Sequence, residues 1–131
     1  MKKVFIYLSL FLLSSPLFAV QCNLEGNQTE MNQCAHNDFL RADRELNKTY
    51  KALIRKSAGN RGYIRALRKS QRAWMKFRDA ELNAIFYCAE RNIRICWGSM
   101  IGVLYPNAKA DLTRDRTKQL KKYLEKSEGD L

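Results

Sequence analysis

Residues 27–56 read NQTEMNQCAHNDFLRADRELNKTYKALIRK and carry the clearest structural pattern in the chain. Apolar side chains recur there every three or four residues, which is the spacing of one face of an α-helix. These positions are Met31, Ala35, Phe39, Ala42, Leu46, Tyr50 and Leu53. Asn27 can cap the helix, with Glu30 three residues later as its capping-box partner. We therefore predict one long amphipathic helix over residues 28–56.

Helical spacing continues beyond this stretch, and no segment alternates between apolar and polar residues as a strand would. The sequence SAGNRG at 57–62 contains two glycines and predicts a turn. A second helical pattern then extends to about Ala89. The positions that define this second pattern are Ile64, Leu67, Gln71, Trp74, Phe77, Leu82 and Ile85.

Residues 93–106 are less regular and contain Gly98, Gly102 and Pro106, so we expect a loop there with room for one helical turn. The last pattern runs from Ala110 to Leu124 and predicts a shorter C-terminal helix. Two long helices joined by a short turn must lie antiparallel to bury their apolar faces. The expected fold is all-α: an antiparallel hairpin of two long helices, covered by the C-terminal helix and linked by disulfides.

The first 19 residues have the layout of a secretory signal peptide. Lys2 and Lys3 precede an apolar run over 4–13, and Ala19 supplies a small residue at the cleavage position. The run is shorter than the roughly 20 residues that cross a bilayer. We expect residues 1–19 to be removed, 20–126 to form one helical domain, and 127–131 to be a frayed tail. Export then places the protein in the periplasm, with secretion as the second choice.

Four cysteines lie in the expected mature chain: Cys22, Cys34, Cys88 and Cys96. An even count in a small exported domain favours two disulfides, and the spacings contain no zinc-binding CxxC pair. Cys88 and Cys96 would lie about 12 Å apart along a straight helix, too far for a disulfide. Their pairing therefore requires the second helix to end between them. We favour the pairs Cys22–Cys34 and Cys88–Cys96; the two other pairings remain open.

The charge is strongly basic: 24 Lys+Arg against 13 Asp+Glu give a net charge of +11, of which Lys2 and Lys3 contribute two. Eleven basic residues and no acidic residue occur over 48–78. In a hairpin both arms bring these charges to one tip, which is either a solvated surface or an anion-binding site. The candidate partner-binding residues there are Arg55, Lys56, Arg61, Arg65, Arg68 and Lys69. Export argues against nucleic acid as the partner.

Several polar residues share faces with core residues of the two long helices. They are Asp43, Asn47, Gln71, Arg78 and Glu81. Polar groups beside a core tryptophan must be paired, so we predict an interhelical network, Asp43 with Arg78 and Asn47 with Gln71. The alternative is a carboxylate pair, Asp43 and Glu81, for acid–base chemistry. The chain has one histidine and no nucleophile, metal set or phosphate loop near this pair, so we expect no enzyme, metal or cofactor.

Five motifs together resemble the LprI-type lysozyme inhibitor family of small exported bacterial proteins. They are Asn27-Gln28-x-x-Met31-Asn32-x-Cys34-Ala35, Ala42-Asp43-x-Glu45-Leu46-Asn47-x-x-Tyr50, Gln71-Arg72-Ala73-Trp74-x-x-Phe77-Arg78-Asp79-Ala80-Glu81, Gly98-Ser99 and Leu112-Thr113-x-x-Arg116-Thr117-x-x-Leu120. The resemblance implies a helical, disulfide-linked envelope protein that inhibits lysozyme. Relatives usually carry cysteines where this chain has Leu82 and Ala110, so the resemblance also implies that the second disulfide has been relocated.

The resemblance suggests a lysozyme, or another peptidoglycan-cleaving enzyme, as the partner, inhibited by obstruction of its cleft. Common animal lysozymes are basic, so a basic inhibitor meets them with long-range repulsion. An inserted cation can still pair with the two catalytic carboxylates of the cleft. The candidates for this role are Arg61 in the turn, or Arg91 and Arg94 beside the second disulfide. The alternative function is an envelope binding module whose basic tip holds an anionic glycolipid or polymer.

Overall fold

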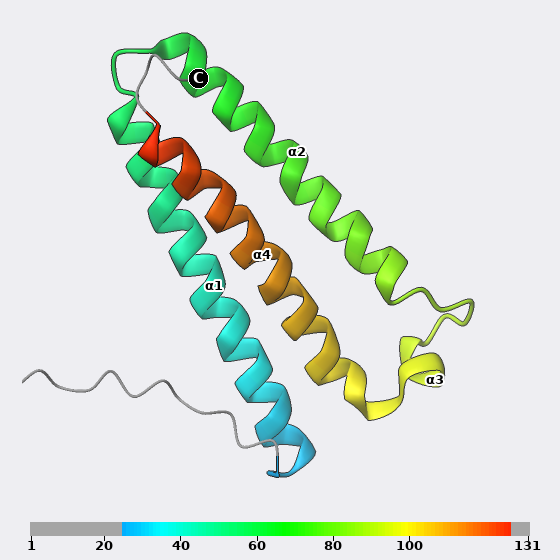
Figure 1. The fold of residues 1–131 in the computed structure, drawn as a ribbon. Coiled ribbons are helices and arrows are strands. Elements are labelled where there is room, and N and C mark those ends of the chain that lie inside the picture. Colours follow the sequence, from blue (N-terminus) through cyan, green and yellow to red (C-terminus); the bar gives the residue numbers. More distant parts are fainter. Residues whose placement is uncertain (1–24, 127–131) are drawn as a thin grey trace, which may run out of the picture.

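A computed structural model describes residues 25–126, which fold into helices with no strand among them (Figure 1). The helices are α1 (Gln28–Lys56), α2 (Arg61–Ile85), α3 (Ile93–Trp97) and α4 (Ile101–Glu125), with a short 3-10 helix, η1 (Gly98–Met100), before α4. The predicted all-α class is confirmed. The predicted signal peptide, Cys22 and the tail at 127–131 lie outside the described residues, so the predicted domain boundaries stay predictions.

Helix α1 has the predicted bounds and the predicted cap. The Asn27 side chain accepts a hydrogen bond from the Glu30 backbone N–H at 3.0 Å, and the Asn27 backbone N–H donates to the Glu30 carboxylate at 3.2 Å. This reciprocal pair satisfies two of the backbone donors that a helix N-terminus leaves without partners. One buried stripe follows, which includes Ala35, Ala42 and Leu46.

Helix α2 ends at Ile85, four residues before the predicted end near Ala89. The early end leaves Cys88 and Cys96 on separate segments, and they form a disulfide with their Cα atoms 5.9 Å apart. The favoured pair Cys88–Cys96 is therefore confirmed. For the other predicted pair, Cys22–Cys34, the partner Cys22 lies outside the described residues, so that pair stays a prediction.

Helix α4 begins at Ile101 and runs through Pro106, so the loop expected over residues 93–106 is wrong in its second half. With 25 residues, α4 is as long as α2. Proline removes one backbone donor, which an interior position of a helix normally uses. The packing of this part of α4 against the rest of the bundle outweighs that local preference, as it often does for helix propensities.

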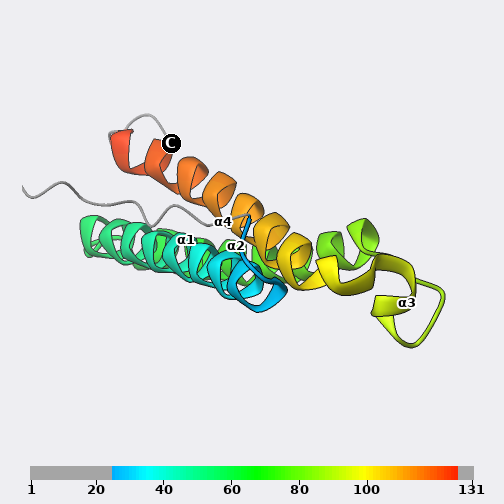
Figure 2. The same ribbon diagram turned by 90° about the horizontal axis from the view of Figure 1, so that it is seen from below.

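The main packing partner of α1 is α4, although α2 follows α1 directly in sequence. Small buried residues on the facing stripes, such as Ala42 on α1 and Ala110 on α4, let the two helices approach closely. The buried hydroxyl of Thr117 donates to the Thr113 carbonyl of its own helix at 3.0 Å, so it needs no partner elsewhere. Figure 1 shows α4 between α1 and α2, and Figure 2 shows its C-terminal end rising out of the layer of the other two.

Helix α2 packs on the bundle through two buried leucines, Leu67 near the turn and Leu82 near its C-terminal end. Leu67 is 3% exposed and packs with Leu46, Leu53 and Leu120 in one core cluster. Ile85 lies 18 residues later, five full turns of helix and therefore on the same face, yet it is 44% exposed. Leu82, by contrast, is 0% exposed, so the C-terminal part of α2 remains packed although α2 diverges from α1 there (Figure 1).

Gly102 marks a close approach of α4 to α1. A Cβ atom placed on Gly102 would lie 2.5 Å from the Asn32 side-chain oxygen, which also accepts a hydrogen bond from Gln28. We expect Gly102→Ala to lower the free energy of unfolding by about 1–3 kcal/mol, the usual cost of overpacking. Urea denaturation followed by circular dichroism measures the change.

The control for this substitution is Gly59→Ala in the exposed turn, where an added Cβ meets nothing within 4 Å. Both variants change the flexibility of the unfolded chain in the same way. Equal denaturation midpoints for the two variants would contradict the close approach at Gly102.

Candidate functional site

The predicted partner-binding cations divide between two ends of the molecule. Arg55, Lys56, Arg61, Arg65, Arg68 and Lys69 surround the α1–α2 turn, and we call them the basic tip. Arg91 and Arg94 lie at the other end, between α2 and α3 and at the start of α3. The 25 residues of α2 span about 37 Å between these ends. One small cleft on a partner therefore cannot contact both groups.

The basic tip has no carboxylate partners within the described part of the chain. The ion pairs of residues 25–126 involve other cations, which lie chiefly on α4 and in the middle of α1 and α2. Lys56 differs from the other tip cations, because its ammonium donates hydrogen bonds to the backbone carbonyls of Leu124 and, at 2.9 Å, of Lys126. Lys56 thus caps the C-terminus of α4, while the other tip cations are exposed to solvent.

The other end is built around the segment 86–97, which we call the disulfide loop. Phe86 is buried at its start, with its ring centroid 5.1 Å from the Trp97 ring and 5.4 Å from the Tyr105 ring. The Asn92 side chain caps α3 by accepting from the Arg94 backbone N–H at 3.0 Å. The disulfide joins the two ends of the loop to each other, and the aromatic cluster holds them against Tyr105 of α4. The loop is therefore held as a defined projection at this end.

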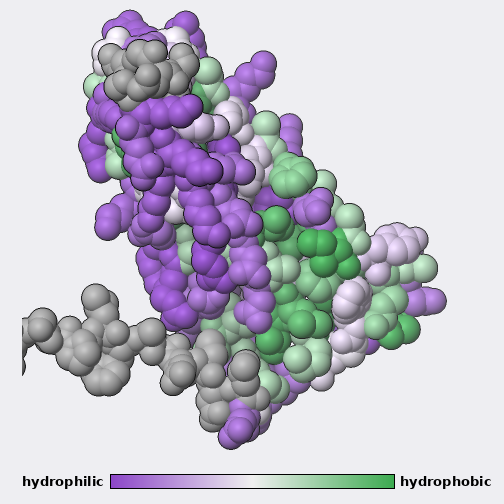
Figure 3. All heavy atoms as spheres, viewed as in Figure 1, coloured by the Kyte–Doolittle hydropathy of each residue, from purple (hydrophilic) through white to green (hydrophobic). Residues whose placement is uncertain are grey.

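The disulfide loop exposes large apolar side chains beside cations. Tyr87 is 73% exposed and Ile95 is 67% exposed, more than the other exposed large hydrophobics of the described chain. Arg91 and Arg94 are exposed and form no ion pair among residues 25–126. Figure 3 shows hydrophobic side chains gathered toward this end, whereas hydrophilic ones cover the tip and α1. Such a mixture of aromatic, aliphatic and arginine side chains is typical of protein-binding surfaces.

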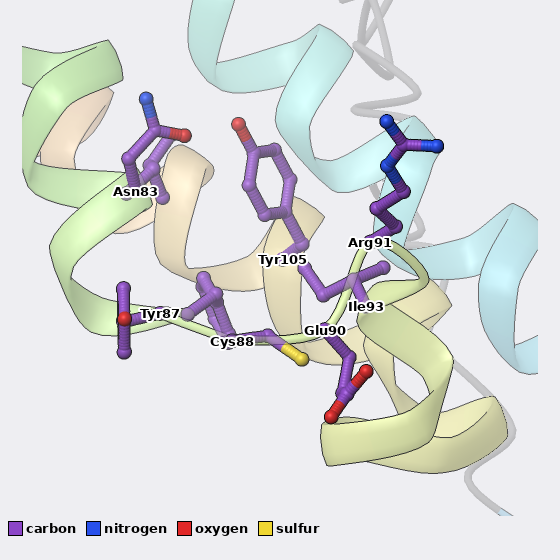
Figure 4. Close-up of a pocket in the computed structure, with 9 residues that line it drawn as sticks. Asn83, Tyr87, Cys88, Glu90, Arg91, Ile93 and Tyr105 are labelled. Atoms are coloured by element: carbon purple, nitrogen blue, oxygen red, sulfur yellow. The ribbon is translucent and has the colours of Figure 1, made fainter.

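A hollow of about 210 Å³ lies between the last turn of α2, the disulfide loop and α4. Its lining includes Leu82, Asn83, Glu90, Arg91 and Tyr105. Figure 4 shows the Arg91 and Tyr105 side chains extending toward the same side, while Glu90 points the other way. The Arg91 guanidinium is therefore presented away from the nearest carboxylate in the loop.

The predicted interhelical polar network is wrong in its pairings. The Asn47 amide donates to Asp43 on its own helix at 3.0 Å, and Arg78 pairs with the adjacent Asp79 at 2.7 Å. Gln71 accepts from Arg116 of α4 at 3.1 Å rather than from Asn47. The physical reason is that α4, not α2, is the close neighbour of α1. Glu81 is half-buried on α2, and nothing in the described structure joins it to Asp43 as a catalytic pair.

Arg116 is the polar residue that sequence reasoning missed. It is 6% exposed, and its guanidinium donates to the side chains of Ser70, Gln71 and Gln119 at 2.9–3.1 Å. Burial lowers the pKa of this guanidinium, and the nearby Tyr123 partly offsets that effect. The sequence did contain an indication of this burial, because Arg116 shares the three-or-four spacing of Thr113, Thr117 and Leu120. An arginine at such spacing indicates a buried polar link between helices.

Two ion pairs tie α1 to α4 on the surface. Arg114 contacts the Asp38 carboxylate at 2.9 Å, and Lys121 contacts Glu45 at 3.0 Å. Partial burial raises the pKa of Asp38, but the hydrogen bonds and charges of Arg114 and Arg41 outweigh it and hold that pKa below its ordinary value. The hydrogen bond from Lys121 likewise lowers the pKa of Glu45. These carboxylates stabilise the helix packing and are not poised as proton donors at neutral pH.

No group of three or more His, Cys, Asp or Glu side chains among residues 25–126 is placed to hold a metal ion. None of the helices in that range is long and apolar enough to cross a membrane.

Fold and surface together define a small, disulfide-braced helical protein with a basic tip and a projecting loop at opposite ends. The family model described as "Lysozyme inhibitor LprI" matches residues 21–120, and the chain belongs to this family. The chain is similar to an uncharacterized protein of Rhizobium meliloti (strain 1021), with 34% identity over 119 residues, covering 82% of this chain and 81% of that protein. No solved structure matches the chain.

Proposed function

We propose that this chain is an exported, non-catalytic protein that binds a lysozyme and inhibits it by placing the disulfide loop in the substrate cleft. Membership of the lysozyme inhibitor family supports lysozyme as the partner. The observation that carries the choice of surface is the exposure of Tyr87 and Ile95 beside Arg91 and Arg94 on one braced loop. The periplasm, reached by means of the predicted signal peptide, is the proposed location.

The chemistry of the loop fits the chemistry of a muramidase cleft. Such a cleft contains two carboxyl groups that flank the scissile glycosidic bond. Arg91 and Arg94 can each form charge-assisted hydrogen bonds with a carboxylate, and these are stronger than neutral ones. Tyr87 and Ile95 add apolar contact area around the charged centre, which excludes water from it. Inhibition then needs only obstruction of the cleft and no reaction.

The position of the basic tip limits the electrostatic repulsion between this basic protein and a basic lysozyme. The tip lies about 37 Å from the disulfide loop, the length of α2. Surface charges are screened over about 8 Å at physiological ionic strength. The tip cations therefore contribute little repulsion when a basic lysozyme docks at the loop end.

The test is a cell-wall lysis assay with c-type, g-type and i-type lysozymes and the oxidised mature protein. We expect stoichiometric inhibition of one class, and we expect Arg91→Ala/Arg94→Ala to weaken that inhibition at least tenfold. Two charge-assisted hydrogen bonds at about 1.5–3 kcal/mol each are sufficient for this loss.

The matched control is Arg65→Ala/Arg68→Ala, which removes two exposed cations from the basic tip. This variant has the same net charge as the loop variant and should inhibit like the parent protein. Loss of inhibition in the tip variant with retention in the loop variant would move the binding surface to the tip. Absence of inhibition for every lysozyme class would overturn the proposed function itself.

A further inference from the structure

Beside the basic tip lies another hollow, which the proposed inhibitor does not use. It has a volume of about 300 Å³ and lies between α2 and the last turn of α4. Its lining residues are Tyr63, Ala66, Leu67, Ser70 and Tyr123. This volume is at the lower end of the range for small-molecule sites, which are mostly apolar with a few placed polar groups.

A buried positive charge lies directly behind one wall of this tip pocket. Arg116 Nη2 donates to the Ser70 hydroxyl oxygen at 2.9 Å, and Ser70 lines the pocket. The other acceptors of the guanidinium, Gln71 and Gln119, are also neutral. No carboxylate forms an ion pair with Arg116 within residues 25–126. Arginine stays charged in proteins, so this wall carries a positive charge without a counter-charge.

The hydroxyl groups that line the tip pocket can donate hydrogen bonds to a molecule inside it. Ser70 accepts the guanidinium N–H, and its own proton remains available for an acceptor inside the pocket. The positive charge behind it strengthens that donor, since hydrogen bonds in chains polarise one another. Burial, with a contribution from Tyr123, raises the pKa of the Tyr63 phenol. Tyr63 therefore keeps its proton at neutral pH and is a second donor.

The remaining surroundings also favour an anion with an apolar body. Ala66 and Leu67 supply apolar lining beside the two tyrosine rings. The C-terminus of α4, next to Tyr123, would normally present the negative end of the helix dipole. Lys56 caps the Leu124 and Lys126 carbonyls and offsets that negative charge. The unpaired cations of the basic tip add to the positive potential near the pocket.

We propose that the tip pocket binds a small amphiphilic oxyanion. Its carboxylate or phosphate group accepts hydrogen bonds from Ser70 and Tyr63, and its apolar segment lies against Ala66 and Leu67. The site is at the end opposite the disulfide loop, so the inference is independent of lysozyme inhibition. The two oxyanion sources, a fatty carboxylate and a phosphate-bearing lipid fragment, share this chemistry and are separated by the probes below.

The test is calorimetric titration of the oxidised mature protein with octanoate, octyl phosphate and octanol. We expect one or both anions to bind with one-to-one stoichiometry and octanol to bind at least tenfold more weakly. Ala66→Leu fills the pocket from an exposed position and should abolish binding. Ser70→Ala removes one donor and should weaken binding of the anion about tenfold. The stronger of the two anions identifies the headgroup.

The matched control is Ala80→Leu, an identical change at an exposed position on the same helix outside the pocket. It should bind the anion like the parent protein. Equal affinity for octanol and octanoate would overturn the oxyanion site, as would equal binding by Ala66→Leu and Ala80→Leu. Absence of binding by every probe would also overturn it. All variants should inhibit lysozyme like the parent protein, so failure here is distinct from failure of the proposed function.

Discussion

Replacing Leu120 with alanine is expected to lower the free energy of unfolding by about 3 kcal/mol. Leu120 is completely buried and packs with Leu46 and Leu53 of α1 and Leu67 of α2. It is therefore the residue through which α4 holds both other long helices. Its truncation leaves a cavity where all three helices meet, in a domain class whose total stability is only about 5–15 kcal/mol. Urea denaturation followed by circular dichroism at 222 nm measures the loss.

Leu104→Ala is the control for this prediction, because Leu104 lies on the same helix and is exposed. Exposed substitutions of this kind usually change stability by no more than about 0.5 kcal/mol. A similar loss of stability for both variants would show that α4 is not the central helix of the bundle.

Replacing both Cys88 and Cys96 with serine is expected to weaken lysozyme inhibition more than tenfold and to lower the free energy of unfolding by about 2.5 kcal/mol. The stability estimate comes from the chain entropy released when a short loop of this size is no longer closed. The loss of inhibition follows because Tyr87, Arg91 and Ile95 lose their fixed arrangement. A binding surface that must be ordered on contact binds more weakly.

Two measurements separate the loop from the bundle in this double variant. Far-ultraviolet circular dichroism should show nearly unchanged helix content, since the main core cluster involves none of residues 86–97. The lysis assay should then report the effect of the loop alone. Retention of full inhibition by a well-folded double variant would exclude the disulfide loop as the inhibitory element. It would leave the basic tip as the surface to examine.

Local features of the sequence were predictable because they depend on residues close in the chain. The cap of α1 joins Asn27 and Glu30, three residues apart, and its apolar stripe repeats along one segment. The Cys88–Cys96 pair required the second helix to end before Cys96, because eight helical residues rise farther than a disulfide can reach, and α2 does end early, at Ile85. The start of α4 was missed because Gly102 and Pro106 disfavour a helix locally.

Candidate site residues were predictable in part. The cations of the tip and loop are visible as charges in the sequence, and Arg91 and Arg94 proved to be exposed. The exposure of Tyr87 and Ile95 was not predictable, because an irregular stretch has no repeating pattern that tells buried apolar residues from exposed ones. The distance between the two groups of cations became known only from the course of α2 in the structure.

The sequence by itself determined the helical class, the bounds of α1 and the strongly basic charge, since each arises from neighbouring residues or from composition. The tertiary structure alone decided that α4 rather than α2 packs along α1, and that Arg116 lies buried against Ser70 and Gln71. Residues 116 and 71 are 45 positions apart. Contacts at such separations depend on how side-chain sizes fit between helices, and no local pattern specifies that fit.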